Sequence, residues 1–360
     1  MRAIAVRGTA FRCYQRLSLE LPGGLVAAVG PNGAGKTALV ELIHFGLLGY
    51  SPRTSDETQL IRFGSDVTRV EVDAGLRGGV TEVTIGYRPG EPKRVQVDGV
   101  TERSVERLLP RFPVLVFTPD RMRLVQGPPA MRRRYFDRVL ARLWPVPAQA
   151  SAEYGRRLVQ RNHLLRRVRA GQAGLDALEP WDAMLAEAGA ELIAARARLC
   201  TRLSAAVAPR LAELGGADTS DPVRYHPSVE GDAQALQRAL AARRSRDIER
   251  AVTGVGPHLD DVVLVEADTD LRRFGSQGEQ RRALLALILG ESDLLSEERD
   301  EQPLLLLDDV TSELDPARRA RLLDAVSRFD QSIVTTADQD DLAAAPVSLL
   351  RVEAGEVRAA

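Results

Sequence analysis

The sequence predicts an α/β protein whose core, a mixed β-sheet with an antiparallel meander, is divided along the chain by an inserted helical lobe. Three observations support this fold class. A continuous apolar run at 25–29 leads into a glycine-rich turn and then a helical pattern. Residues 70–97 alternate apolar and polar side chains, as half-buried strands do. Residues 130–250 are rich in Ala, Leu and Arg with helical spacing, and strand patterns return after residue 262.

The length of 360 residues suits one large core with an inserted lobe. The net charge of −1 excludes a generally basic nucleic-acid coat protein, although it allows a local basic face. The longest apolar run, 283–289, is too short to span a membrane, and the first ten residues lack the apolar centre of a signal peptide. Cys13 and Cys200 have no metal-binding spacing. We therefore expect a cytoplasmic protein.

Most predicted elements of the first 120 residues are strands. Apolar runs at 3–6, 25–29 and 113–117 predict buried strands. After the second run, Leu39, Ile43 and Leu47 recur every fourth residue and predict a helix that ends near Gly49. The meander is predicted from alternating residues around 70–72, 83–87 and 95–97, which Gly78-Gly79 and Pro89-Gly90 separate.

Helical spacing dominates the middle of the chain, for example at Leu185, Ala188, Leu192, Ala195 and Leu199. The segment from Gly215-Gly216 to Pro227 is predicted to be a loop between two helices. Core strands are expected again at 262–265, 304–307, 333–335 and 349–352. The predicted organisation is a first core half at 1–120, a helical lobe at 121–254 and a second core half at 255–360.

A phosphate-binding loop is the strongest motif, because one segment matches the pattern G-x-x-x-x-G-K-[ST]. Its residues are Gly30, Pro31, Asn32, Gly33, Ala34, Gly35, Lys36 and Thr37. Glycines let backbone N–H groups surround phosphate oxygens, and the following helix directs its positive end at the same anion. Lys36 would supply a positive charge, and Thr37 a hydroxyl for Mg²⁺. A chance glycine-rich turn is disfavoured because a strand enters the motif and a helix leaves it.

Lysine is almost absent, which draws attention to Lys36. Only Lys36 and Lys93 are lysines among the 49 basic residues. A lysine retained in this background indicates a place where the wider guanidinium does not fit.

A carboxylate pair follows the apolar run Leu304–Leu307. The position places Asp308 and Asp309 at the carboxyl end of a buried parallel strand, where ligands bind in open α/β sheets. Asp308 would bind Mg²⁺, and Asp309 would orient or deprotonate the attacking water. An acidic turn without function is the alternative when this motif is considered alone.

Two further segments allow both a structural and a functional interpretation. The first is Ser276, Gln277, Gly278, Glu279 and Gln280. Ser276 and Glu279 form a capping-box pattern, yet the same helix start could bind the γ-phosphate of a nucleotide held by another subunit. The second is Ser312-Glu313-Leu314-Asp315-Pro316, where Asp315 and Pro316 are typical of a helix start. Its place just after the carboxylate pair favours a functional role.

Together, these motifs resemble the ATPase heads of the ABC class, and in particular the RecF family of recombinational repair ATPases related to SMC heads. Four other stretches strengthen the resemblance: Phe11-Arg12-x-Tyr14, Ser51-Pro52-Arg53-Thr54, Phe117-Thr118-Pro119-Asp120 and Pro129-x-x-Arg132-Arg133-Arg134-Tyr135-Phe136-Asp137. Thr118 and Asp120-Arg121 depart from the Ser and Glu-Asp of that family, which leaves the nucleotide-sensing residue of this loop open.

The resemblance implies an ABC-type P-loop ATPase head that binds ATP and Mg²⁺, forms a homodimer around two nucleotides and hydrolyses ATP slowly. It assigns residues 276–280 as a signature segment that acts on the partner's nucleotide, and Ser312 and Asp315 as the D-loop. It also implies DNA binding, a role in recombinational repair and replication restart, and the RecR and RecO proteins as partners. Another SMC-like DNA ATPase is the nearest alternative. A transporter ATPase subunit is disfavoured because Thr335-Thr336 stands where transporters have a switch histidine.

Arginines of the lobe are the candidates for DNA contact. The principal ones are Arg132, Arg133, Arg156, Arg157, Arg166 and Arg167, and the others are Arg134, Arg161, Arg169, Arg243, Arg244 and Arg246. A solvated helix face explains them equally well. Because the net charge is −1, we expect DNA binding to need two copies whose arginine faces align.

Overall fold

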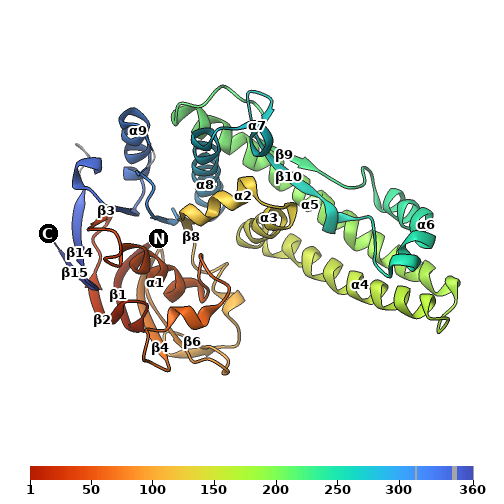
Figure 1. The fold of residues 1–360 in the computed structure, drawn as a ribbon, viewed down its shortest axis with the longest axis horizontal. Helices are drawn as coiled ribbons and strands as arrows, with labels where there is room; N and C mark the ends of the chain where they lie inside the picture. Colours follow the sequence, from red (N-terminus) through yellow and green to blue (C-terminus); the bar gives the residue numbers. More distant parts are fainter. Residues whose placement is uncertain (313, 343–346, 360) are drawn as a thin grey trace. The chain divides into compact units, whose positions relative to one another are not determined.

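The computed structural model describes residues 1–312, 314–342 and 347–359 (Figure 1). The chain forms two compact units. The first, called the head unit, comprises 1–122, 210–216 and 284–360, and the second, called the lobe unit, comprises 123–209 and 217–283. The first boundary lies close to the expected one. At the other end, residues 255–283 belong to the lobe unit rather than to the second half of the core, where we expected them.

An antiparallel sheet forms one half of the head unit. Its strands are β1 (Arg2–Phe11), β2 (Tyr14–Glu20), β4 (Thr68–Leu76), β5 (Gly79–Tyr87), β6 (Arg94–Val97) and β7 (Val100–Glu102), in the order β2-β1-β4-β5-β6-β7. The predicted meander is confirmed as β4, β5 and β6. The first strand is longer than the apolar run at 3–6 predicts, because it pairs with β2 on one side and β4 on the other.

The second sheet of the head unit carries the motifs. Its strands are β3 (Gly24–Val29), β8 (Val114–Phe117), β12 (Leu304–Leu307), β13 (Gln331–Thr336), β14 (Ser348–Glu353) and β15 (Glu356–Ala359), in the order β15-β14-β3-β13-β12-β8. All pairs are parallel except β14 with β15. The carboxyl ends of β3, β13, β12 and β8 therefore meet at one edge, as the sequence predicts for this core.

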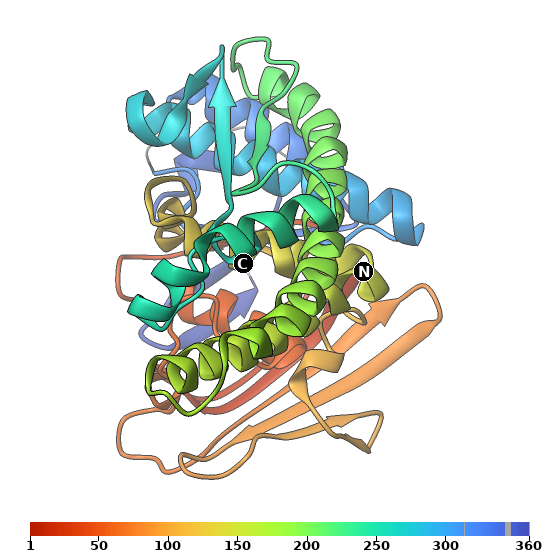
Figure 2. The ribbon, with the colours of Figure 1, turned by 90° about the vertical axis from the view of Figure 1, so that its right-hand side faces the viewer.

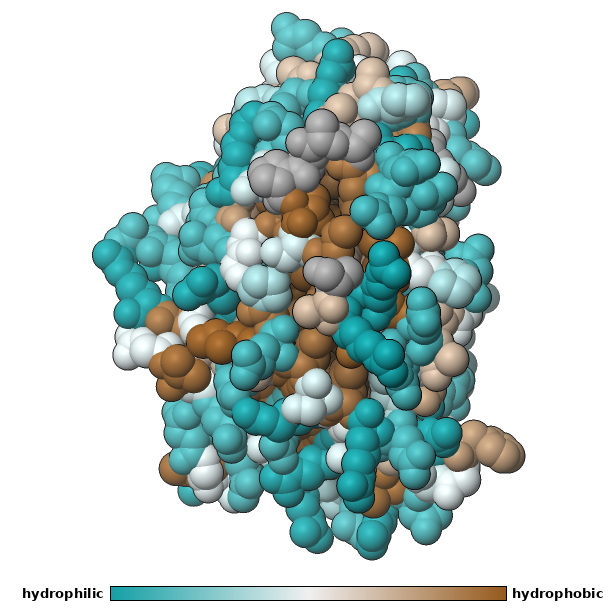
Figure 3. Space-filling view, turned by 90° about the vertical axis from the view of Figure 1, so that its left-hand side faces the viewer, coloured by the Kyte–Doolittle hydropathy of each residue, from teal (hydrophilic) through white to brown (hydrophobic). Residues whose placement is uncertain are grey.

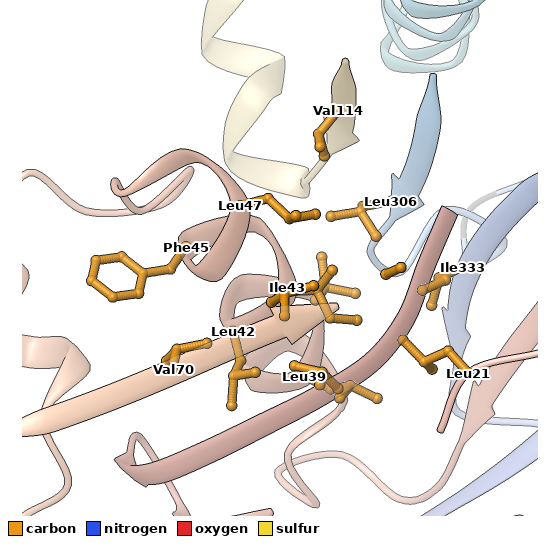
Figure 4. Close-up of a cluster of buried hydrophobic side chains, with 14 of the residues drawn as sticks. Leu21, Leu39, Leu42, Ile43, Phe45, Leu47, Val70, Val114, Leu306 and Ile333 are labelled. Atoms are coloured by element: carbon orange, nitrogen blue, oxygen red, sulfur yellow. The ribbon is translucent and has the colours of Figure 1, made fainter. Parts of the chain in front are cut away.

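Helix α1 (Lys36–Leu48) lies at the centre of the head unit. Its bounds and its C-cap at Gly49 agree with the sequence, but it is buried on every side rather than on one face. Figure 4 shows Leu42 beside Val70 of the antiparallel sheet, and Leu47 toward Leu306 of the parallel sheet. Gly46 permits the close approach, because a Cβ there would lie 2.5 Å from the Val72 side chain.

The two lysines of the chain lie at the two ends of α1. Lys36 is its first residue, and the Lys93 ammonium donates to the Gly49 carbonyl at its C-terminal end (2.6 Å) and to Glu57 (2.6 Å). A cation at a helix C-terminus stabilises the exposed carbonyls of the last turn. Lys93 therefore anchors the end of α1 that lies away from the phosphate-binding loop.

Replacing Lys93 with methionine is expected to lower the free energy of unfolding by about 2 kcal/mol, because charge-assisted hydrogen bonds are lost in a half-buried setting. Urea unfolding measures the effect. The control is Arg94→Met, since the Arg94 side chain is 84% exposed. That variant should change the free energy of unfolding by less than about 0.5 kcal/mol. Equal stability of the two variants would contradict the anchoring role of Lys93.

The remaining elements of the head unit are short. They are η1 (Glu57–Leu60), η2 (Val105–Arg107), η3 (Pro119–Met122), α9 (Pro316–Ser327) and η6 (Gln339–Leu342). The unit also contains residues 210–213 of α5 (Leu178–Glu213) and residues 284–299 of α8 (Gln277–Arg299).

The lobe unit is mainly helical, as predicted (Figure 2). Besides parts of α5 and α8, it contains α2 (Arg123–Gln126), α3 (Pro129–Leu143), α4 (Pro145–Arg169), η4 (Leu175–Ala177), α6 (Ala233–Arg250), η5 (Pro257–Leu259) and α7 (Leu271–Phe274). It also holds a three-stranded sheet of β9 (Val223–His226), β10 (Asp261–Glu266) and β11 (Thr269–Asp270), in the order β11-β10-β9.

This small sheet corrects two predictions. The segment from Gly215 to Pro227 contains β9, so it is not wholly a loop. The strand expected in the core at 262–265 is β10, which pairs with β9 instead. An apolar strand pattern indicates a buried strand but does not say in which sheet the strand pairs.

The length and hydropathy of the helices in the described ranges bear on membrane spanning. No helix in this part of the chain has an apolar stretch of the length and hydropathy needed to cross a bilayer. On one face of the molecule, polar side chains form the periphery and apolar side chains gather in the middle (Figure 3).

Candidate nucleotide-binding site

The phosphate-binding loop connects β3 to α1. Gly35 adopts φ +119°, and a Cβ there would lie 2.9 Å from both Cys13 Sγ and Tyr14 Oη. Only glycine combines this backbone conformation with such close neighbours. Helix α1 has no side-chain cap and no acidic residue in its first turn. Its first N–H groups and the positive end of its dipole are therefore available to an anion.

Lys36 extends back over this loop. Its ammonium donates to the carbonyls of Gly30 (2.6 Å) and Pro31 (3.0 Å). Burial lowers the pKa of Lys36, and the charges of Asp309 and Asp308 oppose that shift. A buried ammonium on backbone carbonyls is suited to exchange them for phosphate oxygens, so the residues fit a nucleotide phosphate.

Thr37 and Asp308 meet at the edge of the parallel sheet. The Thr37 hydroxyl donates to Asp308 Oδ1 (2.9 Å), and Asp308 is only 2% exposed. Burial raises the pKa of Asp308, while the hydroxyls of Thr335 and Thr37 counteract this. The described ranges contain no group of three His, Cys, Asp or Glu residues that could hold a metal ion. A hydroxyl, one carboxylate and phosphate oxygens instead form the hard oxygen set that Mg²⁺ prefers.

Asp309 follows in a left-handed backbone conformation, with φ +50°. Its N–H donates to the Thr335 hydroxyl (2.8 Å). The structure therefore brings the predicted residues Lys36, Thr37, Asp308 and Asp309 together in the head unit.

A charged network beside α1 was not predicted from the sequence. Glu41 is completely buried, and Arg12 donates to its two oxygens (2.7 and 2.8 Å). Ser51 donates to the same carboxylate (2.5 Å). The Arg53 guanidinium lies 4.0 Å from the Glu41 carboxylate and 3.8 Å from the Asp120 carboxylate. Asp120 belongs to the loop for which the sequence did not identify the nucleotide-sensing residue. Arg12, Ser51 and Arg53 belong to stretches that carry the family resemblance, but no pattern linked them to Glu41.

The signature segment lies at the start of α8 and forms the capping box that its pattern indicates. The Ser276 hydroxyl accepts from the Glu279 N–H (3.3 Å), and Glu279 accepts from the Ser276 N–H (2.8 Å). Gln280 is buried, and its amide donates to the Leu271 carbonyl (2.7 Å). In the first turn, Gln277 is exposed and Gly278 is half-buried. Action on a partner's nucleotide stays a prediction.

The D-loop segment leads from Asp309 to α9. Asp315 caps α9 by accepting from the Arg318 N–H (2.9 Å), and Pro316 is the first helical residue, as predicted. The Ser312 hydroxyl donates to the Asp309 carbonyl (3.3 Å). Glu313 lies outside the described residues.

Two of the candidate DNA-binding arginines are buried inside the lobe unit. Arg132 is 2% exposed, and its guanidinium donates to both oxygens of Asp261 (2.7 and 2.8 Å). Arg161 is wholly buried between Asp182 (2.7 Å) and Asp247 (2.9 Å). The prediction that these two contact DNA was wrong, because helical spacing does not reveal a carboxylate partner far along the chain.

The other principal candidate arginines differ in their burial and in their contacts with other residues. Arg133 is half-buried and donates to the Asp260 carbonyl (2.7 Å). Arg156 and Arg157 both pair with Glu153, and Arg157 is half-buried. Arg166 and Arg167, near the end of α4, are exposed. Of the principal candidates, only these last two have neither burial nor an ion pair among the described contacts.

The burial of Arg132 leads to a stability prediction. Arg132→Met should lower the free energy of unfolding by about 3 kcal/mol, because Asp261 loses its buried partner. Arg166→Met should change it by less than about 0.5 kcal/mol. Urea unfolding measures the free energy of unfolding of both variants. In a DNA titration at fixed salt, only Arg166→Met is expected to bind DNA more weakly than the wild type. Reduced DNA affinity of a fully folded Arg132→Met protein would contradict the structural role.

Comparisons with known proteins agree with this arrangement. The family model described as "RecF/RecN/SMC N terminal domain" matches residues 3–358. The chain belongs to the RecF family. It is 39% identical over 362 residues to "DNA replication and repair protein RecF" of Symbiobacterium thermophilum, covering 97% of this chain and 96% of that one. It is 38% identical to the protein of that name from Chloroflexus aurantiacus, covering 96% and 97%.

Solved structures support both the RecF family and the ABC-type head. "Structure of the recombination mediator protein RecF-ATP in RecFOR pathway" has a TM-score of 0.89 at 27% identity and covers 99% of this chain and 97% of that one. An SMC head bound to the C-winged helix domain of ScpA has a TM-score of 0.59 at 15% identity, covering 100% and 97%. The second likeness concerns the fold alone. The fold class expected from the sequence is confirmed.

Proposed function

We propose that this RecF-family protein is an ATPase of DNA repair that binds DNA as an ATP-dependent homodimer. The observation that carries the proposal is the convergence of two segments that are far apart in the chain of the head unit. The uncapped start of α1, with Lys36 and Thr37, meets Asp308 at the end of β12. The names of the ATP-bound RecF structures agree with ATP as the ligand.

Each residue has a defined part in hydrolysis. Lys36 would attract the β- and γ-phosphates, and the N–H groups of 33–37 would hold their oxygens. Thr37 and Asp308 would hold Mg²⁺, which when bound neutralises charge on the phosphates. Asp309 would orient the attacking water, and its carboxylate would receive a proton from it. We expect slow turnover, stimulated by DNA.

Dimerisation would complete the site. Ser276 and the start of α8 offer a hydroxyl and N–H groups, which would bind the γ-phosphate held by the partner's loop. The D-loop residues Ser312 and Asp315 would lie near the same junction. ATP would then join two copies, and the exposed arginines of α4 in each copy would form one DNA-binding face. A transporter role is disfavoured, because β13 ends in Thr335 and Thr336 rather than in a histidine.

The relatives' names extend the proposal to partners. They name DNA replication and repair and the RecFOR pathway. We therefore propose that the protein acts with RecO and RecR proteins in loading the recombinase at gaps and in replication restart. A cytoplasmic location stays a prediction from the sequence.

Light scattering in solution tests the proposal. The mass is measured without nucleotide, with ADP and with a non-hydrolysable ATP analogue, each with and without DNA. A dimer is expected only with the ATP analogue, and DNA should bind only to that dimer. Monomers under all conditions would contradict the head-to-head arrangement, whereas an ATP-independent dimer would contradict the role of the nucleotide.

A further inference from the structure

The end of strand β13 carries two buried threonines whose side chains have different partners. The Thr335 hydroxyl donates to Asp308 Oδ1 (2.8 Å) and accepts from the Asp309 N–H (2.8 Å). The Thr336 hydroxyl instead donates to Asp341 (2.8 Å). Successive residues of a strand point to opposite faces, so only Thr335 is directed at the carboxylate pair.

This placement follows from strand pairing. Strand β13 lies between β3 and β12, with Leu307 opposite Val334 and Val334 opposite Ala27. Thr335 therefore stands one residue beyond that row, at the edge where Asp308 follows β12. It is wholly buried, so water does not compete for its hydroxyl.

We propose that Thr335 is the positioning residue of the Asp308–Asp309 pair at the Mg²⁺–ATP site. The inference rests on the proposed function, because it gives the pair the role of holding Mg²⁺ and orienting water. A hydroxyl can donate to the carboxylate and accept from the next backbone N–H at the same time. It thereby fixes the side chain of one residue and the backbone of the next with a single group.

The backbone of Asp309 shows why such a group is needed. Its φ of +50° is uncommon for a residue with a side chain and persists only where surrounding contacts hold it. The hydrogen bond from its N–H to Thr335 is one such contact. Asp308 Oδ1 also accepts from Thr37, which would turn to Mg²⁺ when the metal binds. Thr335 would then continue to orient the carboxylate.

Three variants separate positioning from packing. Thr335→Val has nearly the same shape without the hydroxyl, and Thr335→Ser keeps the hydroxyl. The matched control is Thr68→Val, in the antiparallel sheet, where a buried threonine hydroxyl donates to the Thr9 carbonyl (3.0 Å). Two quantities are measured for each: the Mg²⁺ dependence of ATP hydrolysis, and ATP binding with Mg²⁺ and with EDTA.

Thr335→Val should bind ATP like the wild type in EDTA. It should need about 10- to 100-fold more Mg²⁺, or turn over by the same factor more slowly, as is typical when the group that orients a metal ligand is lost. Thr335→Ser should restore both quantities to within about threefold. Thr68→Val should lose stability alone. Thr335→Ala repeats the comparison where Thr335→Val does not fold.

The outcomes distinguish this inference from the proposed function. The inference is overturned if Thr335→Val and the wild type have both the same Mg²⁺ dependence and the same turnover. It is also overturned if Thr335→Ser is as defective as Thr335→Val. The Mg²⁺ dependence of ATP binding needs no turnover. One outcome separates the two proposals: the wild type does not hydrolyse ATP but binds it in a Mg²⁺-dependent manner, and Thr335→Val loses that Mg²⁺ dependence. This result would contradict the proposed ATPase and support the positioning role.

Discussion

Lys36→Arg should abolish most ATP hydrolysis while leaving a folded protein that still binds some nucleotide. Loss of one group that stabilises developing charge typically lowers turnover by about 100-fold or more. The Lys36 ammonium lies 2.6 Å and 3.0 Å from two carbonyls of its own loop, and its side chain is largely buried. A planar guanidinium is too wide for this position, although it keeps the charge. Steady-state hydrolysis and equilibrium binding of an ATP analogue measure the two effects.

Lys93→Arg is the matched control, because it makes the same change at the opposite end of α1. Its ammonium contacts a carbonyl and Glu57 but no predicted phosphate ligand. It should lower stability without changing turnover per folded molecule. Wild-type turnover in Lys36→Arg would refute the assignment of the phosphate-binding loop as the catalytic centre.

Ser276→Arg should prevent ATP-dependent dimerisation, hydrolysis and DNA binding together. A bulky side chain at the start of α8 would block closure on the partner's nucleotide, although each copy would still bind ATP through its own loop. Loss of the Ser276 cap costs only about 1 kcal/mol of stability. Sedimentation with ATP and a DNA titration at fixed salt measure the association and the DNA affinity.

Asp232→Ala serves as the control for loss of a cap alone. Asp232 caps α6 in the same unit by accepting from the Ala235 N–H (2.9 Å). Its replacement should cost similar stability and leave dimerisation intact. A Ser276→Arg protein that melts slightly lower, yet dimerises and binds DNA normally, would assign the segment to capping and remove the main support for the head-to-head arrangement.

The elements that the sequence predicted correctly are encoded by neighbouring residues. The strand, turn and helix from Leu25 to Gly49 are one continuous pattern, and Asp315-Pro316 starts α9 as its local pattern indicates. Where a prediction was wrong, a distant partner was responsible. Strand β10 pairs with β9 in the lobe unit, and Arg132 is buried on Asp261, which is 129 residues away.

The sequence by itself determined the phosphate-binding loop, the carboxylate pair and the family, because each depends on the identity and order of adjacent residues. Only the tertiary structure decided that Glu41 is buried between arginines and that Thr335 holds Asp308 and Asp309. The first contact depends on how the turn after β1 packs against α1, and the second on the register between β12 and β13. Packing of distant segments sets both, so no local pattern of side chains can express them.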